Sequence, residues 1–117
     1  MNKRHRLGRR GEQIAASYFR SNGYRVLESN YRYKRAEIDL ICQRENWLIF
    51  AEVKTRTSVR FGYPEECVSH EQCLRIMDAA EAYAIENKID ALIRYDIISI
   101  IWLGNAYSLS HFEDAFF

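Results

Sequence analysis

Two short acidic segments in the first half of the chain combine residue types that bind divalent metal ions. The first is Glu37-Ile38-Asp39, and the second, thirteen residues after its aspartate, is Glu52-Val53-Lys54. Carboxylate oxygens are the hard ligands that Mg²⁺ prefers, and Mg²⁺ keeps coordination positions open for water and phosphate. The two segments therefore predict a metal site that could accept a phosphate group, with a lysine beside it.

The sequence around each acidic segment predicts a strand. Short, alternating runs of β-branched and other apolar residues cover about 37–43 and 47–54. Only three residues separate these runs, so an antiparallel hairpin is the simplest connection. If Glu45 and Asn46 form a two-residue turn, we expect Asp39 to lie opposite Glu52.

The same register makes two further predictions. It places Glu37 opposite Lys54, and it gives the other face of the hairpin to a set of apolar residues. These residues are Ala36, Ile38, Leu40, Ile49, Ala51 and Val53.

A plainer interpretation is that the acids are solvated charges on an exposed hairpin face, with Lys54 neutralising Glu52 or Glu37. Like charges opposite one another destabilise a ladder, and two close carboxylates raise one pKa unless a cation lies between them. Glu-x-Asp or Glu-x-Lys alone is a weak signal. Both on adjacent strands, followed by Thr55-Arg56, form a much stronger one.

Length and composition place the chain in one class. Its 117 residues suit a single domain, 1–117, with one core, and the 48% of apolar residues excludes a disordered chain. We expect no membrane association, because no apolar run reaches spanning length and no signal-peptide core follows the N-terminus. Three cysteines without a Cys-x-x-Cys spacing predict reduced thiols and a cytoplasmic protein.

The net charge of +1 conceals two opposite halves. Residues 1–60 hold 14 Lys and Arg against 6 Asp and Glu, whereas residues 61–117 hold 3 against 10. A basic half around an acidic cluster suits a phosphodiester polymer, although an Arg-rich N-terminus can also be a solvated tail and opposite halves can simply attract each other. Candidates for contacts with nucleic acid include Arg9, Arg10, Lys34, Arg35, Arg56 and Arg60.

The remaining elements follow from periodicity and stop signals. Residues 31–35, which mix tyrosines with basic residues, could stack bases and track phosphates, or form a turn. Residues 55–68 read as a surface loop, and Ser69 is the expected N-cap of the second helix, with Gln72 at the capping-box position. The sequence predicts helices at about 7–21 and 69–87, and strands at about 24–30, 37–43, 47–54, 92–103 and 106–110.

This order predicts an α/β fold with a mixed five-stranded sheet flanked by helices. The second helix can supply the crossover that a parallel strand pair requires.

Several motifs, in this order and spacing, resemble the small bacterial YraN-like family of uncharacterised proteins. The motifs are Gly11-Glu12, Glu37-Ile38-Asp39-Leu40-Ile41, Phe50-Ala51-Glu52-Val53-Lys54-Thr55-Arg56, Phe61-Gly62 and Arg94-Tyr95-Asp96. That family is regarded as a distant branch of the PD-(D/E)XK nuclease superfamily, akin to archaeal Holliday-junction resolvases. The resemblance covers nearly the whole chain and implies a restriction-endonuclease-like core, with the catalytic carboxylates on its second and third strands.

The resemblance also implies roles for individual residues. Asp39 and Glu52 look like the metal-binding acids, and the Val53 carbonyl looks like a further ligand. Lys54 resembles the lysine that positions the attacking water or stabilises the transition state, and Glu12 resembles a supporting acid on a helix. Glu37 is an accessory acid characteristic of this branch.

The sequence departs from the family pattern at two positions. Ala36 stands where glycine is usual and Gln72 where a helix lysine is common. The first could restrict a close backbone approach, and the second removes a phosphate contact.

We therefore expect an endonuclease that hydrolyses phosphodiester bonds of DNA, including branched or damaged structures, with Mg²⁺ or Mn²⁺. The alternative is a non-catalytic nucleic-acid-binding module with the same fold; an adaptor that binds proteins through its acidic half is a third interpretation. A homodimer would match a two-fold symmetric junction, although no stretch of sequence identifies a self-complementary patch.

Overall fold

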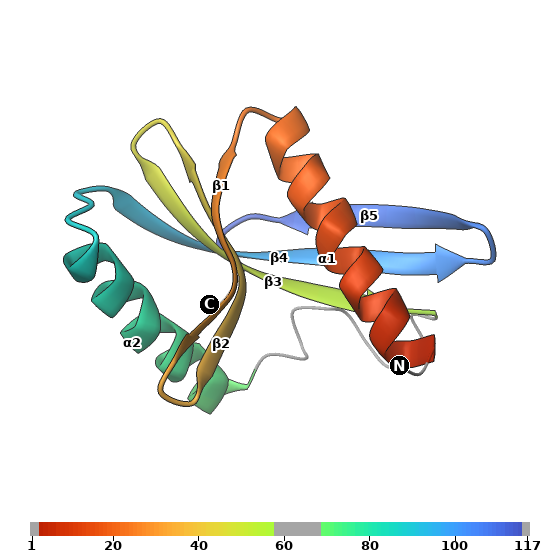
Figure 1. Cartoon of the computed structure of the whole chain (residues 1–117), viewed down its shortest axis with the longest axis horizontal. Helices are drawn as coiled ribbons and strands as arrows, with labels where there is room; N and C mark the ends of the chain where they lie inside the picture. Colours follow the sequence, from red (N-terminus) through yellow and green to blue (C-terminus); the bar gives the residue numbers. More distant parts are fainter. Residues whose placement is uncertain (1–2, 58–68, 116–117) are drawn as a thin grey trace.

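The computed structural model describes residues 3–57 and 69–115. Its elements follow the predicted order of one helix, three strands, one helix and two strands. They are α1 (Lys3–Ser21), β1 (Arg25–Tyr33), β2 (Ala36–Arg44), β3 (Trp47–Arg56), α2 (His70–Glu86), β4 (Leu92–Leu103) and β5 (Ala106–Phe112). Figure 1 shows α1 and α2 on opposite sides of the strands.

The five strands form one mixed sheet in the order β1-β2-β3-β4-β5. All neighbours are antiparallel except β3 and β4, which run parallel. The chain between those two strands contains α2, so this helix supplies the crossover that a parallel pair needs. The predicted mixed five-stranded sheet with two helices is confirmed.

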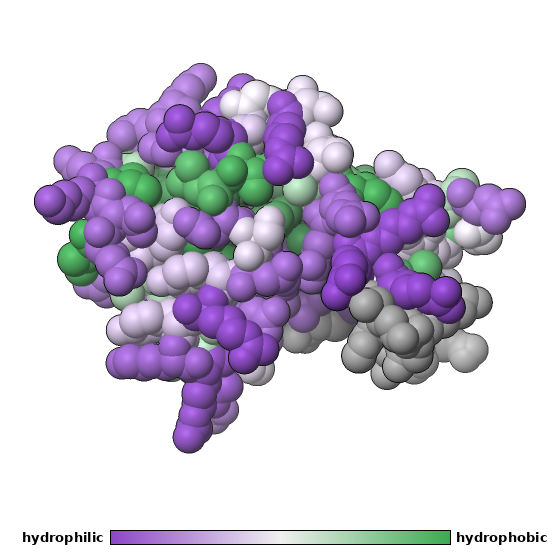
Figure 2. Space-filling model, viewed as in Figure 1, coloured by the Kyte–Doolittle hydropathy of each residue, from purple (hydrophilic) through white to green (hydrophobic). Residues whose placement is uncertain are grey.

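The core consists of two clusters, one on each face of the sheet. The α1-side cluster contains Ala15, Phe19, Leu40, Ile49 and Ile98, among others. The α2-side cluster contains Ile38, Ile41, Phe50, Ile76 and Ile97, among others. Because Ile97 and Ile98 face opposite clusters, β4 is covered on both sides, as its unbroken apolar sequence predicts. Figure 2 shows hydrophilic side chains predominating on the outer surface in the same view.

The helix ends follow the stop and start signals in the sequence. Gly23, with φ +85°, closes α1, and the N–H of Tyr24 reaches the carbonyl of Phe19 at 2.9 Å. Ser69 caps α2, because its side chain accepts a hydrogen bond from the N–H of Gln72 at 3.1 Å. Neither helix of the described segments is long and apolar enough to cross a membrane.

Two elements extend three or more residues beyond their predicted bounds, and β3 and β5 each extend by two, to Arg56 and Phe112. The helix α1 begins at Lys3 and not at residue 7, because lysine and arginine favour helices nearly as well as alanine. The strand β1 continues to Tyr33, where the sequence predicted an end at residue 30. Tyr31 and Tyr33 pack against the α2-side cluster, so the aromatic half of segment 31–35 belongs to the core, and only Lys34 and Arg35 form the turn.

The strand β2 changes the face to which its side chains point. Ile38 and Ile41 both join the α2-side cluster, whereas Leu40 joins the α1-side cluster. The prediction that Ala36, Ile38 and Leu40 share one face is therefore wrong for the first two. The change coincides with Asn30 of β1, whose φ of +53° interrupts the extended backbone beside this part of β2.

Candidate active site

The two predicted acids lie where β2 and β3 separate. The predicted two-residue turn at Glu45-Asn46 is present, and the ladder runs from Arg44 opposite Trp47 to Leu40 opposite Ala51. Beyond that pair, β2 remains bonded to β1 and β3 to β4, so the strands diverge into a fork. Asp39 and Glu52 are the first residues past the last pair. The predicted register is confirmed over these pairs, but Asp39 and Glu52 flank the opening of the fork and are not ladder partners. The prediction that Glu37 lies opposite Lys54 is wrong, because Glu37 pairs with Arg32 of β1 and Lys54 with Ser99 of β4.

Asp39 takes the place of the missing backbone partner. Its Oδ2 accepts a hydrogen bond from the backbone N–H of Val53 at 2.7 Å. In an antiparallel ladder the N–H and the C=O of one residue point to the same side. Val53 continues the extended strand β3, so its carbonyl is expected to point to the same side as its N–H, toward the fork.

Glu52 and Lys54 lie on the β3 side of the fork. The two residues follow Phe50 at alternate positions of β3, so they continue the face that carries the α2-side cluster. Lys54 Nζ lies 3.4 Å from Glu52 Oε1, and the two side chains are 22% and 12% exposed. An ion pair this deeply placed is screened less by solvent than a surface pair.

Glycine at position 11 brings α1 close to the same end of β3. A Cβ atom at Gly11 would clash with Oγ1 of Thr55, so a larger residue would require the Thr55 side chain or the helix to move. The neighbouring residue Glu12 is half-buried, and its charge raises the pKa of both Asp39 and Glu52. The close approach explains how an acid on a helix adds to a site built by two strands.

The negative charges of Asp39 and Glu52 are only partly compensated by positive charges nearby. Burial, followed by the charge of Glu52, raises the pKa of Asp39 to about 8. Burial also raises the pKa of Glu52, although Lys54 opposes the shift. Strong pKa shifts of this kind concentrate at functional sites. A cation bound beside such a carboxylate would stabilise its charged form.

A pocket of about 430 Å³ opens in front of the acids. Arg35 and Arg75 contribute positive charge to its wall, and the N-terminal turn of α2 contributes Ser69 and Gln72. The described residues that line it are Arg35, Ala36, Glu37, Asp39, Glu52, Ser69, Gln72, Arg75 and Ile76. Carboxylates therefore face arginines across one space, which suits a ligand that carries both a metal ion and a phosphate group.

The other predicted basic residues are dispersed. Arg10 does not line this pocket and places its guanidinium 5.2 Å from the centre of the Trp102 ring. Lys34 lies over Tyr33 in the turn that joins β1 to β2, Arg9 is exposed on α1, and Arg56 is half-buried at the end of β3. Arg60 lies outside the described residues. Arg75 was not predicted, because a lone arginine within a helical stretch carries no spacing signal.

The donor set suits a hard divalent ion with few protein ligands. Two carboxylates and one backbone carbonyl face the fork, and oxygen donors of this type hold Mg²⁺ while several water molecules stay bound. Within residues 3–57 and 69–115, no three side chains from His, Cys, Asp and Glu converge closely enough to form a protein-only cage.

A second buried acid, Asp96 of β4, belongs to the motif Arg94-Tyr95-Asp96, but its role and its distant partners were not predicted. Its side chain is fully buried and accepts hydrogen bonds from Arg94 Nε at 2.9 Å and Nη2 at 2.8 Å, and from the N–H of Asp114 at 3.0 Å. His111 Nε2 lies 2.6 Å from Asp96 Oδ2, and its Nδ1 lies 2.9 Å from the hydroxyl of Tyr18. Partners separated by up to 93 positions leave no local pattern to detect.

Comparison with known proteins identifies relatives of nearly equal length. The pattern of the family described as "Uncharacterised protein family UPF0102" matches residues 11–100. A UPF0102 protein of Christiangramia forsetii is 42% identical over 100% of this chain and 98% of its own length. A second, of Flavobacterium psychrophilum, is 40% identical over 95% of this chain and 93% of its own. A third, of Alkaliphilus oremlandii, is 38% identical over 99% of this chain and 100% of its own.

Proposed function

We propose that this chain, which belongs to the UPF0102 family of YraN-like proteins, is a metal-dependent endonuclease that hydrolyses phosphodiester bonds of DNA. The proposal rests on one observation. Asp39 and Glu52 both lie at the fork and the pKa of each is raised, and of these two acids only Glu52 forms an ion pair with a described lysine, Lys54. We also propose that the sheet is a restriction-endonuclease-like core of the PD-(D/E)XK superfamily, since its acids lie on β2 and β3 as that architecture requires.

Three groups would hold the metal ion: the carboxylates of Asp39 and Glu52 and the carbonyl of Val53. Bound there, Mg²⁺ or Mn²⁺ would supply Lewis-acid activation of the scissile phosphate and of the attacking water. Asp39 must release its bond to the Val53 N–H or share its oxygens, and a carboxylate has enough acceptor sites for both.

The remaining charged residues of the site would stabilise negative charge on the substrate or attract the metal ion. Lys54 already lies 3.4 Å from Glu52 and would offset the negative charge that develops on the phosphoryl oxygens. Arg35 and Arg75 line the same pocket and would hold the adjoining phosphates of the strand. Glu12 and Glu37 add negative charge near the fork and so strengthen its attraction for a cation.

The test compares cleavage of branched, nicked, single-stranded and plain duplex DNA in Mg²⁺ or Mn²⁺ by four proteins. They are the parent chain, Asp39→Asn, Lys54→Ala and the control Asp78→Asn, which changes an exposed acid of α2. We expect cleavage by the parent and the control, and a loss of at least about 100-fold in the other two. Equal cleavage by all four proteins would reject the site as its source.

The alternative of a non-catalytic nucleic-acid-binding module is favoured by one observation, the lack of a three-ligand cage among the described side chains. Calorimetric titration with Mn²⁺ separates the two functions. A heat of Mn²⁺ binding that is measured with the parent but not with Asp39→Asn supports the nuclease. No uptake by the parent, together with salt-dependent binding of DNA, supports the module.

A further inference from the structure

The two edges of the sheet are protected to very different degrees. An exposed edge strand offers unpaired N–H and C=O groups to other strands, and proteins block such pairing with charges, bulges and kinks. The outer edge of β1 has all three: it carries Arg25, Glu28 and Arg32, its register shifts between Val26 and Glu28, and Asn30 adopts a φ of +53°.

The edge strand β5 has none of these devices. Its sequence, Ala106-Tyr107-Ser108-Leu109-Ser110-His111-Phe112, contains no Lys, Arg, Asp, Glu or Pro. It pairs with β4 without a register shift, from Ile97 opposite Phe112 to Leu103 opposite Ala106. No described element pairs with its other edge. Seven residues in regular extended conformation give a strand edge about 23 Å long that no described strand covers.

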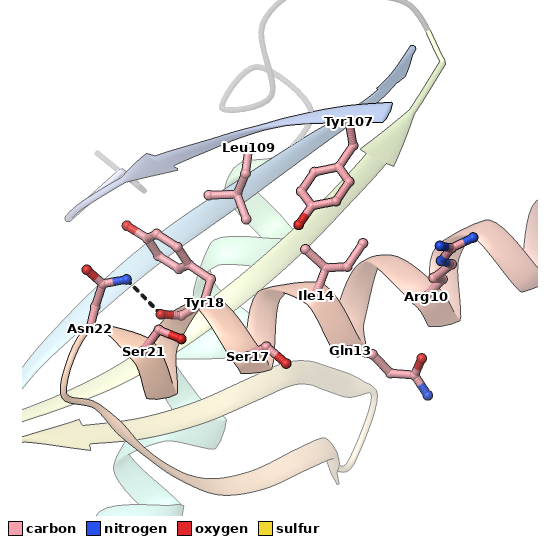
Figure 3. A pocket seen from close by; sticks show the side chains of 9 residues that line it. All are labelled: Arg10, Gln13, Ile14, Ser17, Tyr18, Ser21, Asn22, Tyr107 and Leu109. Carbon is pink, nitrogen blue, oxygen red and sulfur yellow. Dashed lines mark hydrogen bonds between the residues drawn. The ribbon is translucent and has the colours of Figure 1, made fainter. Parts of the chain in front are cut away.

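Apolar side chains are exposed beside this free edge. Tyr107 is 47% exposed, and Leu103, at the tip of the same hairpin, is 62% exposed. A groove of about 560 Å³ lies between β5 and α1. Figure 3 shows Tyr107 and Leu109 projecting from β5 toward α1, while Ile14 and Tyr18 project toward them. A strand added to β5 would extend this half-covered apolar face.

The charges around β5 suit a second copy of the same strand. Antiparallel pairing places the end of one β5 beside the start of the other. Glu113 follows the end of β5; it lies 3.8 Å from Arg94 Nη1 but stays 60% exposed, and Arg10 lines the groove with Tyr107 near the start. Each copy would therefore bring an acid toward a base of the other, and no like charges would meet along the uncharged strands.

We propose that β5 and the adjoining groove form an isologous interface, in which two copies of this chain pair their β5 strands antiparallel and join two sheets into one. Tyr107 and Leu109 of each copy would enter the shared apolar surface. The interface is independent of the proposed nuclease chemistry, because none of its residues lines the pocket at the fork.

Sedimentation velocity at about 1–100 µM tests the proposal with a matched pair of variants. Ser108→Lys adds a charge to the unprotected edge, and Ser29→Lys makes the same change on β1; both serines are exposed. We expect the parent and Ser29→Lys to reach twice the chain mass of 13.9 kDa. We expect Ser108→Lys to weaken dimerisation at least about tenfold, with thermal unfolding showing that both variants fold.

Single cysteine substitutions at positions 107–110 locate the symmetry axis. Identical residues meet at an isologous two-fold axis, so a cysteine near it should form a disulfide-linked dimer on mild oxidation. All variants carry Cys67→Ser, because Cys67 lies outside the described residues, whereas Cys42 and Cys73 are buried; the same chain without an added cysteine and Ser29→Cys are the controls. Two results would overturn the proposal. One is a protein that stays monomeric across the concentration range. The other is a dimer that Ser108→Lys leaves intact and that forms disulfide cross-links no more readily through β5 than through position 29.

Discussion

The two buried acidic centres of this small protein differ in how completely their charge is compensated. Asp96 has Arg94, His111 and a backbone N–H within hydrogen-bonding distance, and these partners lower its pKa although burial alone would raise it. Asp39 has one backbone N–H and lies beside a second acid, and its pKa is raised to about 8. Both centres lie in the same sheet, on strands separated only by β3.

The comparison separates an acid that supports the fold from acids that are available for chemistry. A buried carboxylate with a full set of partners has its charge compensated, so that removing one partner is destabilising, and its oxygens are already occupied. A buried pair with too few partners costs stability, and the fold retains it only where something else is gained. Uneven compensation, and not burial itself, identifies the fork as the functional candidate.

The largest effect should follow from removing the partner of Asp96. We expect Arg94→Met to lower the free energy of unfolding by about 3–5 kcal/mol, because it leaves a fully buried carboxylate with an uncompensated charge. The matched control is Arg32→Met, whose pair with Glu37 is exposed, and this should cost less than about 1 kcal/mol. Urea unfolding measures both. Equal losses would mean that the Asp96 centre is no more important to the fold than a surface pair.

The fork should respond in the opposite direction. We expect Asp39→Asn to raise the free energy of unfolding by about 2 kcal/mol at pH 8 without metal, because asparagine removes the repelled charge and its oxygen still accepts from Val53 N–H. The same variant should lose DNA cleavage. The control Asp78→Asn should stay within about 0.5 kcal/mol of the parent. A destabilised Asp39→Asn would show that the fork is compensated after all.

The pH dependence of stability should separate the two centres within one protein. The folded pKa of Asp39, about 8, exceeds its ordinary value of 3.8, so the folded state binds an extra proton and stability falls as pH rises between these values. The folded pKa of Asp96 is lowered, so its contribution is complete above 3.8 and is lost as pH falls further. In EDTA, the parent should therefore lose stability from pH 5 to 8 more steeply than Asp39→Asn. Parallel curves would contradict the raised pKa.

The fork was predictable because all its parts are local in sequence. The alternation of Glu37 to Gln43 and of Trp47 to Lys54 gives two strands, and a two-residue turn fixes the register that brings Asp39 and Glu52 together. The sequence could not show that the strands diverge one pair before the acids meet. That divergence depends on β4 holding β3 and on β1 holding β2, which are contacts between distant parts of the chain.

The Asp96 centre was not predictable for the opposite reason. Tyr18 comes from α1, Tyr24 from the α1–β1 connection, Arg94 from β4 and His111 from β5, and no spacing rule links them. The motif Arg94-Tyr95-Asp96 was visible, but only the fold shows that Arg94 and Asp96 pair on one face of β4 while Tyr95 packs toward the α2-side cluster. Long-range networks of this type follow from topology, which local periodicity does not encode.

The smallest effect concerns a hydroxyl next to the undercompensated fork. Ser99 of β4 is 2% exposed, its Oγ has no hydrogen-bond partner among the described residues, and it is in register with Lys54 of β3. A buried unsatisfied hydroxyl costs stability, so Ser99→Ala should raise the free energy of unfolding by up to about 1 kcal/mol. The exposed residue Ser110, which pairs with Ser99 from β5, provides the control Ser110→Ala, with a change near zero. If Ser99→Ala also slows DNA cleavage, the unpaired hydroxyl serves Lys54 or the substrate. A clear loss of stability would instead show that Ser99 has a partner in solution and that the polar deficit is confined to the acids.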